Sequence, residues 1–145
     1  MTGESICKFF ETLKLEAYLC PAGKPTIGWG HTDNVKMGQK ISVAQAEVFF
    51  DHDYQEAEEG VKSLVKVPLN EHQLGALTSF VFNLGKGNLA KSTLLKKLNA
   101  LDYAGAGAEF TKWNKATVNG KLVELAGLTK RRECERQLFE GFSNG

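Results

Sequence analysis

Apolar residues recur at helical spacing at the start of the chain, and a glycine-rich pattern follows. Four apolar residues between Ile6 and Leu13 fall on one helical face, which predicts an amphipathic helix that ends near Leu13 to Leu15. The next stretch, AYLCPAGKPTIGWGHT, is rich in proline and glycine. These residues exclude a helix, and the β-favouring residues between them predict short paired strands. A further strand is expected near Val35 to Met37.

Longer helical patterns fill the rest of the chain. Ser42 and Gln45 form a capping box, and the apolar stripe behind them predicts one long helix that stops before Pro68. The same capping signal, an asparagine with a glutamine three residues later, precedes a second apolar helix that ends at Gly85. The remaining predicted elements are helices over residues 92–99, 102–113 and 129–139, and a tight turn at Asn119-Gly120.

Together these elements predict an α+β protein that is mostly helical, with its only sheet in the N-terminal third. The chain has 145 residues, of which 42% are hydrophobic and 24% are charged, the balance of one ordinary domain. We therefore expect a single domain over residues 1–145. A β-containing lobe over about 12–60 and a helical lobe made of 1–11 and 61–145 would be joined by the long helix.

Charge, apolar runs and cysteines exclude several classes of protein. The net charge of +1 is too small to indicate a nucleic-acid partner by itself. The apolar run FVFNLG is far shorter than the ~20 residues of a membrane span. The first residues, MTGESICKFF, carry an acid where a signal peptide would carry lysine or arginine, and no long apolar region follows. Three cysteines without CxxC spacing predict free thiols rather than a disulfide framework or a zinc site.

One run on the predicted long helix combines acidic residues with a histidine. Asp51-His52-Asp53 has residue types that bind metals. It lies on the predicted long helix, however, where adjacent residues point in different directions. We therefore expect no metal site, and no cofactor.

Three residues near the start of the chain are candidates for chemistry. Glu11 lies about 150° from the centre of the apolar stripe of its helix, so taken alone it is a surface glutamate. Cys20 lies in a loop, which favours partial exposure, although a packed core thiol is the commoner role of a lone cysteine. Thr26 alone is an ordinary strand residue.

The spacing of these residues resembles that of the phage-type lysozymes. Eight residues separate Glu11 from Cys20 and five separate Cys20 from Thr26. The block FFETLKLEAYLCPAGKPTIGWGHT resembles the opening of that family, glycoside hydrolase family 24. Two later stretches, SFVFNLGKGNLAKSTLLKKLN and GLTKRRECERQLF, resemble its FxFNxG…STLxxxLN and GLxxRRxxExxLF blocks. Three blocks in order over nearly the whole chain are more specific than a single motif.

The resemblance implies a lysozyme-like, two-lobed muramidase. Such an enzyme hydrolyses the β-1,4 bond between N-acetylmuramic acid and N-acetylglucosamine in peptidoglycan, and Glu11 would be its general acid. Cys20 and Thr26 would act on the attacking water. The positions that match residues lining the substrate groove are Thr32, Phe82 and Asn83.

The resemblance also implies how the protein meets its partners. We expect a monomeric endolysin that binds peptidoglycan, does not bind nucleic acid and has no stable membrane association. It would be made in the host cytoplasm and would act on the periplasmic cell wall. To get there it would depend on a holin-type membrane lesion, or it would be delivered as part of a particle.

Two residues depart from the pattern of the family. Thr12 stands where a glycine commonly follows the catalytic glutamate, which should affect how the helix ends. Cys20 stands where many members carry aspartate, although one branch has cysteine in a similar AYxCPAG context. Cys20 then either activates water, as in an inverting enzyme, or attacks the sugar, as in a retaining one. We favour water activation, because thioglycosides are poor substrates for acid-assisted cleavage.

Two other classes of function compete with this interpretation. A cysteine peptidase or amidase would use Cys20 and His31, with Asp33 to orient the histidine, but it leaves Glu11 without a role. A catalytically silent wall-binding protein would be expected to lose Glu11. In the charged run over 130–136, we interpret Arg131 and Glu135 as an i,i+4 pair on a solvated helix face rather than as a polyanion site.

Overall fold

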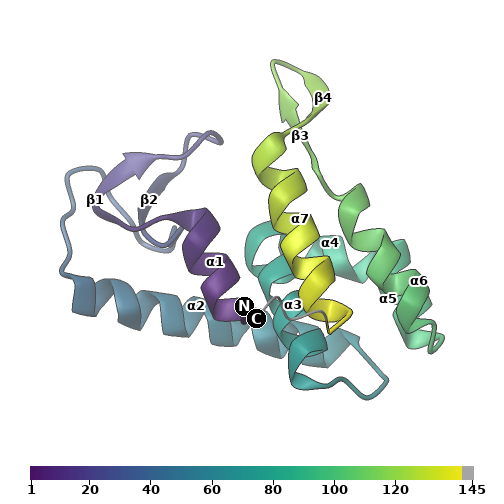
Figure 1. Cartoon of the computed structure of the whole chain (residues 1–145). Helices are drawn as coiled ribbons and strands as arrows, with labels where there is room; N and C mark the ends of the chain where they lie inside the picture. The colour runs from purple at the N-terminus through teal and green to yellow at the C-terminus, as the bar shows by residue number, and fades with distance from the viewer. Residues whose placement is uncertain (142–145) are drawn as a thin grey trace.

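A single long helix, α2 (Val43–Leu64), runs along one side of the molecule and connects its two ends (Figure 1). The computed structural model describes residues 1–141. Strands β1 (Lys14–Leu19) and β2 (Pro25–Gly28) lie over the N-terminal half of α2, and α3 (Glu71–Leu84) follows its other end. The expected mostly helical α+β architecture is confirmed.

The sequence accounts for the length of α2. The Ser42 side chain accepts a bond from the Gln45 backbone N–H, and the Gln45 side chain accepts one from the Ser42 backbone N–H, so both bonds of the predicted capping box form. Residues of its apolar stripe are buried, including Ala46, Phe50, Ala57 and Val61. Within residues 1–141 no helix has both the length and the apolar composition of a membrane span.

Helix α1 (Gly3–Glu11) ends earlier than the sequence predicts. We expected its end near Leu13 to Leu15, but Thr12 has φ 51° and ψ 144°, which no helix can include. A residue with a β-carbon is strained in this conformation, and glycine is not. This backbone suits the glycine that the resemblance leads one to expect at this position better than it suits Thr12.

Close approach of two glycines fixes the other end of α1. A side chain at Gly3 would overlap the carbonyl of Gly75 in α3 and the hydroxyl of Tyr54 in α2. Helix α1 therefore packs directly onto both helices, and its buried residues Ile6 and Cys7 face the interior. This packing holds Glu11, the last residue of α1, at a defined place.

The β1–β2 hairpin forms as predicted, but the expected strand near Val35 to Met37 does not. Asn34 has φ 55°, and the chain makes turns there. The contact with β1 comes later: the Ala17 N–H donates to the Gln39 carbonyl at 2.9 Å, and the Ile41 N–H donates to the Leu15 carbonyl at 2.9 Å. The sequence thus predicted a third segment beside the hairpin but placed it a few residues too early.

The helical part is built around α3, six consecutive residues of which, Ala76–Val81, are buried. Its other elements are α4 (Lys86–Ala90), α5 (Thr93–Asn99), α6 (Tyr103–Glu109), the 3-10 turn η1 (Phe110–Lys112) and α7 (Ala126–Phe139). The helix expected over 102–113 changes to a 3-10 turn after Glu109, α7 begins three residues earlier than expected, and α4 was not predicted.

The expectation of a single sheet is wrong, because β3 (Lys115–Val118) and β4 (Lys121–Glu124) form a second antiparallel hairpin. The predicted tight turn connects them: Asn119 and Gly120 have φ of 51° and 79°, the pattern of a type I′ turn. All four β4 residues are exposed, so this hairpin lacks the alternation of apolar and polar residues by which strands are recognised.

Candidate active site

Glu11 lies at the C-terminal end of α1 and is partly open to solvent, with 22% of its side chain exposed. A carboxylate at this end of a helix is disfavoured by the helix dipole. Arg131 of α7 offsets this, because its Nη1 donates to Glu11 Oε2 at 2.6 Å. The pair joins residues 120 positions apart in the chain.

Arg131 is buried, with only 2% of its surface exposed. Its Nη2 donates to the Ser79 carbonyl at 3.3 Å, and its Nε lies 3.4 Å from Glu135 Oε2. Burial would lower the pKa of Arg131, but the carboxylates of Glu11 and Glu135 raise it above its usual value. Arg131 therefore stays charged beside Glu11.

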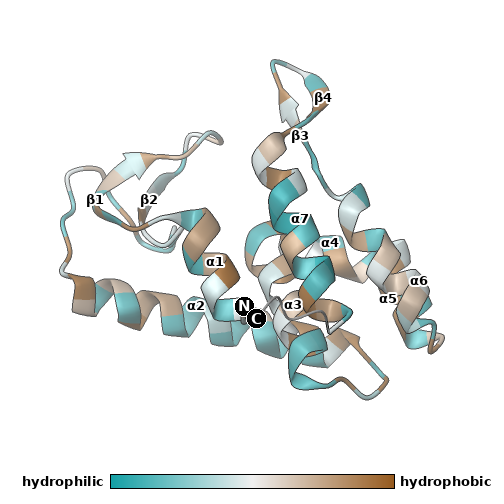
Figure 2. Cartoon of the chain, viewed as in Figure 1, coloured by the Kyte–Doolittle hydropathy of each residue, from teal (hydrophilic) through white to brown (hydrophobic). Residues whose placement is uncertain are grey.

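The interpretation of Arg131 and Glu135 as a solvated pair is wrong. Figure 2 shows α7 as a largely hydrophilic helix, yet it packs against α1, α3 and α6, and Glu135 is fully buried. Burial raises the pKa of Glu135, although Arg132 and Arg131 oppose this shift. Helical periodicity does not reveal this site, and the only signal in the sequence was the resemblance of GLTKRRECERQLF to a block of the family.

Arg132 completes the buried charge network and holds Asn83. Its Nη2 donates to Asn83 Oδ1 at 2.8 Å, and its Nε lies 2.8 Å from Glu135 Oε1. Burial lowers the pKa of Arg132 to about 10, although the Glu135 carboxylate acts against this. Two arginines and two carboxylates, Glu11 and Glu135, therefore balance their charges.

A glycine from the β-containing part packs against the other oxygen of Glu11. Gly30 has φ 75°, and a β-carbon there would lie 2.7 Å from Glu11 Oε1. The adjacent backbone is held by reciprocal bonds of 2.9 Å between Ile27 and His31. Glu11 is thus fixed between α7 on one side and the loop after β2 on the other.

Cys20 and Thr26 lie on the β1–β2 hairpin. Cys20 is partly exposed, as expected, and Thr26 is 97% buried, with 3% exposed. A hydrogen bond from the Lys24 backbone N–H holds the pKa of the Cys20 thiol below its usual value, and the Ala22 N–H and the Thr26 hydroxyl act in the same direction. The Thr26 hydroxyl also donates to the Lys24 carbonyl at 2.9 Å; with one proton it serves only one of these acceptors at a time.

The pKa of Tyr18 is influenced by both Glu11 and Cys20. Tyr18 pairs with Thr26 in the hairpin. Burial raises the pKa of Tyr18, and the negative charges of Glu11 and Cys20 raise it further. Glu11 and Cys20 therefore act in the same direction on the Tyr18 phenol.

A cleft of about 590 Å³ opens beside Gly30. Thr32 and Phe82, two of the three residues matched to the substrate groove, line it. The third, Asn83, turns its side-chain oxygen to the buried Arg132. The walls also carry lysines and acidic residues, so the cleft is strongly polar.

His31 does not have the partner that the peptidase or amidase alternative needs. Its Nδ1 lies 2.7 Å from Asp53 Oδ2, and its ring stacks on Phe49 with centroids 4.2 Å apart. Asp33, the expected orienting residue, is exposed. Backbone groups of the hairpin and the Thr26 hydroxyl lower the pKa of Cys20, so the hairpin rather than His31 supports a thiolate.

Comparisons with known proteins agree with the geometry. The phage lysozyme family model matches residues 8–135. The endolysin of Acyrthosiphon pisum secondary endosymbiont phage 1 is 49% identical over 138 residues, which cover 95% of this chain and 94% of the relative.

Solved structures give the same result. The endolysin from Escherichia coli O157:H7 phage FAHEc1 superposes with a TM-score of 0.89 at 37% identity, over 99% of this chain and 93% of that one. The muramidase domain of SpmX from Asticaccaulis excentricus gives 0.88 at 34% identity, over 94% and 93%. With a family match over most of its length and relatives of this similarity, the chain belongs to the phage lysozyme family of glycoside hydrolases.

Proposed function

We propose that this phage endolysin hydrolyses peptidoglycan at the β-1,4 bond between N-acetylmuramic acid and N-acetylglucosamine, with Glu11 as the general acid. The observation that carries the proposal is the asymmetric setting of the Glu11 carboxylate. Arg131 binds Oε2 at 2.6 Å, whereas Oε1 faces Gly30, which lines the cleft. Because Arg131 occupies Oε2, Glu11 must take up a proton on Oε1 before the reaction, and Oε1 then delivers it to the leaving glycosidic oxygen.

Cys20 and Thr26 act on the attacking water in this proposal. The resemblance places Cys20 where aspartate is common, so its sulfur must be a thiolate to take a proton from water. The hairpin N–H groups that lower the pKa of Cys20 favour the thiolate. When the Thr26 hydroxyl donates to the Lys24 carbonyl, its oxygen accepts a hydrogen bond from the water. The water oxygen then bonds to the anomeric carbon, Cys20 receives the water proton, and the leaving oxygen receives the proton of Glu11.

The cleft binds the glycan in this proposal. Thr32 offers a hydroxyl and Phe82 an apolar face, and both line the cleft. Asn83 acts indirectly, because its side-chain oxygen is held by the buried Arg132, which is next in the chain to the Glu11 partner Arg131. One chain supplies all of these groups, so no second copy is needed and the enzyme is proposed to act as a monomer. Sedimentation analysis at assay concentration tests the oligomeric state.

The first prediction concerns Glu11. Glu11→Gln should lower the rate of release of reducing ends from purified peptidoglycan by roughly 100-fold to 10,000-fold, because an amide cannot donate the acid proton. Its oxygen can still accept the Arg131 bond, so the thermal unfolding curve should change little. Glu16→Gln, on the exposed β1 strand, is the matched control. A Glu11→Gln enzyme with nearly normal activity would refute the assignment.

The second prediction concerns the partner of Glu11. Arg131→Met keeps much of the side-chain volume but leaves Glu11 and Glu135 without this cation, so the free energy of unfolding should fall by about 3–5 kcal/mol. Arg136→Met, which removes a partly exposed pair with Glu140, should cost less than about 1 kcal/mol. Denaturant unfolding measures both, and equal losses would show that Arg131 is not a buried ion partner.

The third prediction concerns Cys20. A thiol protonated at low pH cannot accept a proton, so the activity of the natural enzyme should rise with pH through the lowered pKa of Cys20. Cys20→Asp should stay active and shift this acidic limb to lower pH, because the usual pKa of aspartate, about 3.9, lies well below that of cysteine, about 8.5. Cys134→Ser should leave the limb in place.

The anomer released first distinguishes the two roles of Cys20. Water activation predicts the α-anomer, detected by NMR during hydrolysis. The β-anomer together with a covalent adduct on Cys20, detected by mass spectrometry, would show nucleophilic attack and overturn the water-activating role.

The fourth prediction concerns access to the wall. We propose that a holin-type lesion releases the enzyme, because a folded domain with this many charged side chains does not cross a lipid bilayer unaided. In cells that express the enzyme, turbidity should fall only when a pore-forming protein is induced as well. Glu11→Gln with the same pore is the control, and rapid lysis without any pore would contradict the proposal.

A further inference from the structure

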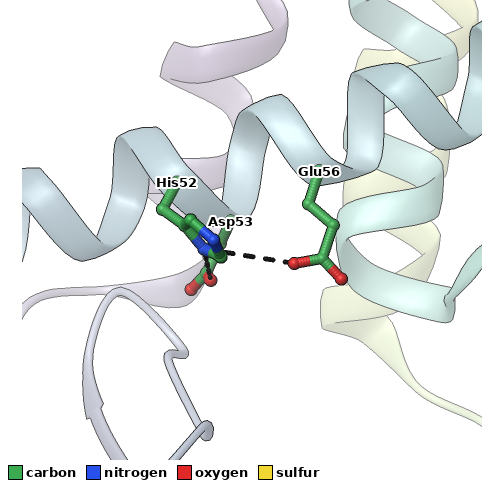
Figure 3. Close-up of side chains that lie close together, drawn as sticks. All are labelled: His52, Asp53 and Glu56. Atoms are coloured by element: carbon green, nitrogen blue, oxygen red, sulfur yellow. Dashed lines mark hydrogen bonds and ion pairs between the residues drawn. The ribbon is translucent and has the colours of Figure 1, made fainter.

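Three side chains of α2 converge beside the cleft (Figure 3). His52 Nδ1 lies 3.4 Å from Asp53 Oδ1 and 4.0 Å from Glu56 Oε2. One ligand atom from each residue lies within 4.8 Å of the other two. His52 and Asp53 are adjacent in the chain and differ in exposure, at 68% and 23%, yet one atom of each comes within 3.4 Å of the other.

We propose that His52, Asp53 and Glu56 form a binding site for a divalent transition-metal ion of the zinc type. Tetrahedral zinc with bonds of 2.0–2.1 Å places its ligand atoms about 3.3 Å apart. The separations of 3.4 and 4.0 Å are close to this value. One imidazole nitrogen with two carboxylate oxygens suits zinc, nickel or copper better than the all-oxygen sites of calcium and magnesium.

Asp53 is held in place by a residue outside the ligand set. His31 is 8% exposed, and its Nδ1 lies 2.7 Å from Asp53 Oδ2, which leaves Oδ1 directed at His52. Such outer contacts orient the ligands of metal sites. This contact distinguishes the group from a simple acidic cluster. The buried His31 ring holds Asp53 Oδ2, and Asp53 Oδ1 then faces the exposed His52 ring.

The other two ligands are free to close on an ion. The side chains of His52 and Glu56 are 68% and 76% exposed, so small rotations shorten the 4.0 Å separation without moving the core. They are four residues apart on one helix, where side chains lie one above the other. Three protein ligands leave a fourth position open to water in the cleft.

The site has a consequence for catalysis, and this consequence rests on the proposed function. Gly30, Thr32 and Phe82 line the same cleft as the three ligands. An ion with its bound water would occupy part of the space proposed for the glycan. Zinc should therefore slow hydrolysis.

Zinc titration followed by NMR of the histidine rings tests the site directly. In the natural protein the His52 resonances should shift first and those of His31 should follow through Asp53. His72, which is exposed on α3, should not shift at the same zinc concentration. Equal responses of His52 and His72, or no response of His52, would overturn the proposal.

Variants separate this site from other zinc-binding groups. His52→Ala and Glu56→Gln each remove a direct ligand, so each should weaken zinc binding in calorimetry by at least the roughly 10-fold that loss of an outer contact costs, whereas Asp51→Asn and His72→Ala should leave it unchanged. The partly exposed thiols Cys20 and Cys134 remain in every variant, so the difference from the natural protein measures the α2 site. Unchanged affinity in His52→Ala would overturn it.

Hydrolysis assays test the consequence separately. Zinc should inhibit the natural enzyme more strongly than His52→Ala, each compared with its own rate without zinc. Equal inhibition alongside binding at His52 would overturn the effect on catalysis. The role of Glu11 is decided independently, by Glu11→Gln without zinc.

Discussion

The ion pair between Glu11 and Arg131 is the constraint on which the arrangement of the active site depends. It joins the first helix to the last across 120 residues of sequence, and the arginine is almost completely buried. A buried guanidinium costs several kcal/mol unless its charge is compensated, so α1 and α7 are favoured only in positions where the two side chains meet. A second carboxylate, Glu135, and the Ser79 carbonyl share the same cation. The partly exposed Glu11 carboxylate is thereby tied to the buried core of the helical region.

Backbone conformation places the other half of the site. Thr12, with φ 51°, stops α1 directly after Glu11 and sends the chain into β1, so the hairpin begins beside the carboxylate. The loop after β2 returns to the same point, where Gly30 approaches Glu11 Oε1 too closely for any side chain. The strained backbone at Thr12 and the absence of a side chain at Gly30 together bring the β-containing region against Oε1 of a carboxylate whose Oε2 is already bound by Arg131.

Local signals explain what the sequence could predict. Capping residues and apolar periodicity act over a few residues, so α2 and α3 begin where Ser42 and Asn70 indicate, and the partial exposure of Cys20 follows from its place in a loop. The buried network could not be found in this way, because an arginine and a glutamate four residues apart also form ordinary surface pairs. Only the packing of α7 against other helices distinguishes the two cases. The strands of the β3–β4 hairpin were not predicted for a similar reason. They are mostly exposed, so only the Asn119-Gly120 turn could be recognised from the sequence.

Two thiols of this chain show how placement determines chemistry. Cys7 is buried against Arg131, yet burial raises its pKa to about 12 despite the nearby guanidinium, so it remains a packed, protonated side chain. The pKa of Cys20 is lowered by backbone N–H groups of the hairpin turn and not by a cation. The turn lowers the pKa of Cys20, because its partly exposed sulfur loses little hydration while it gains hydrogen bonds. The neighbouring arginine does not lower the pKa of Cys7, because burial outweighs it. The turn after β1 supplies the setting of Cys20, and the Thr26 hydroxyl is among the groups that lower the pKa of Cys20.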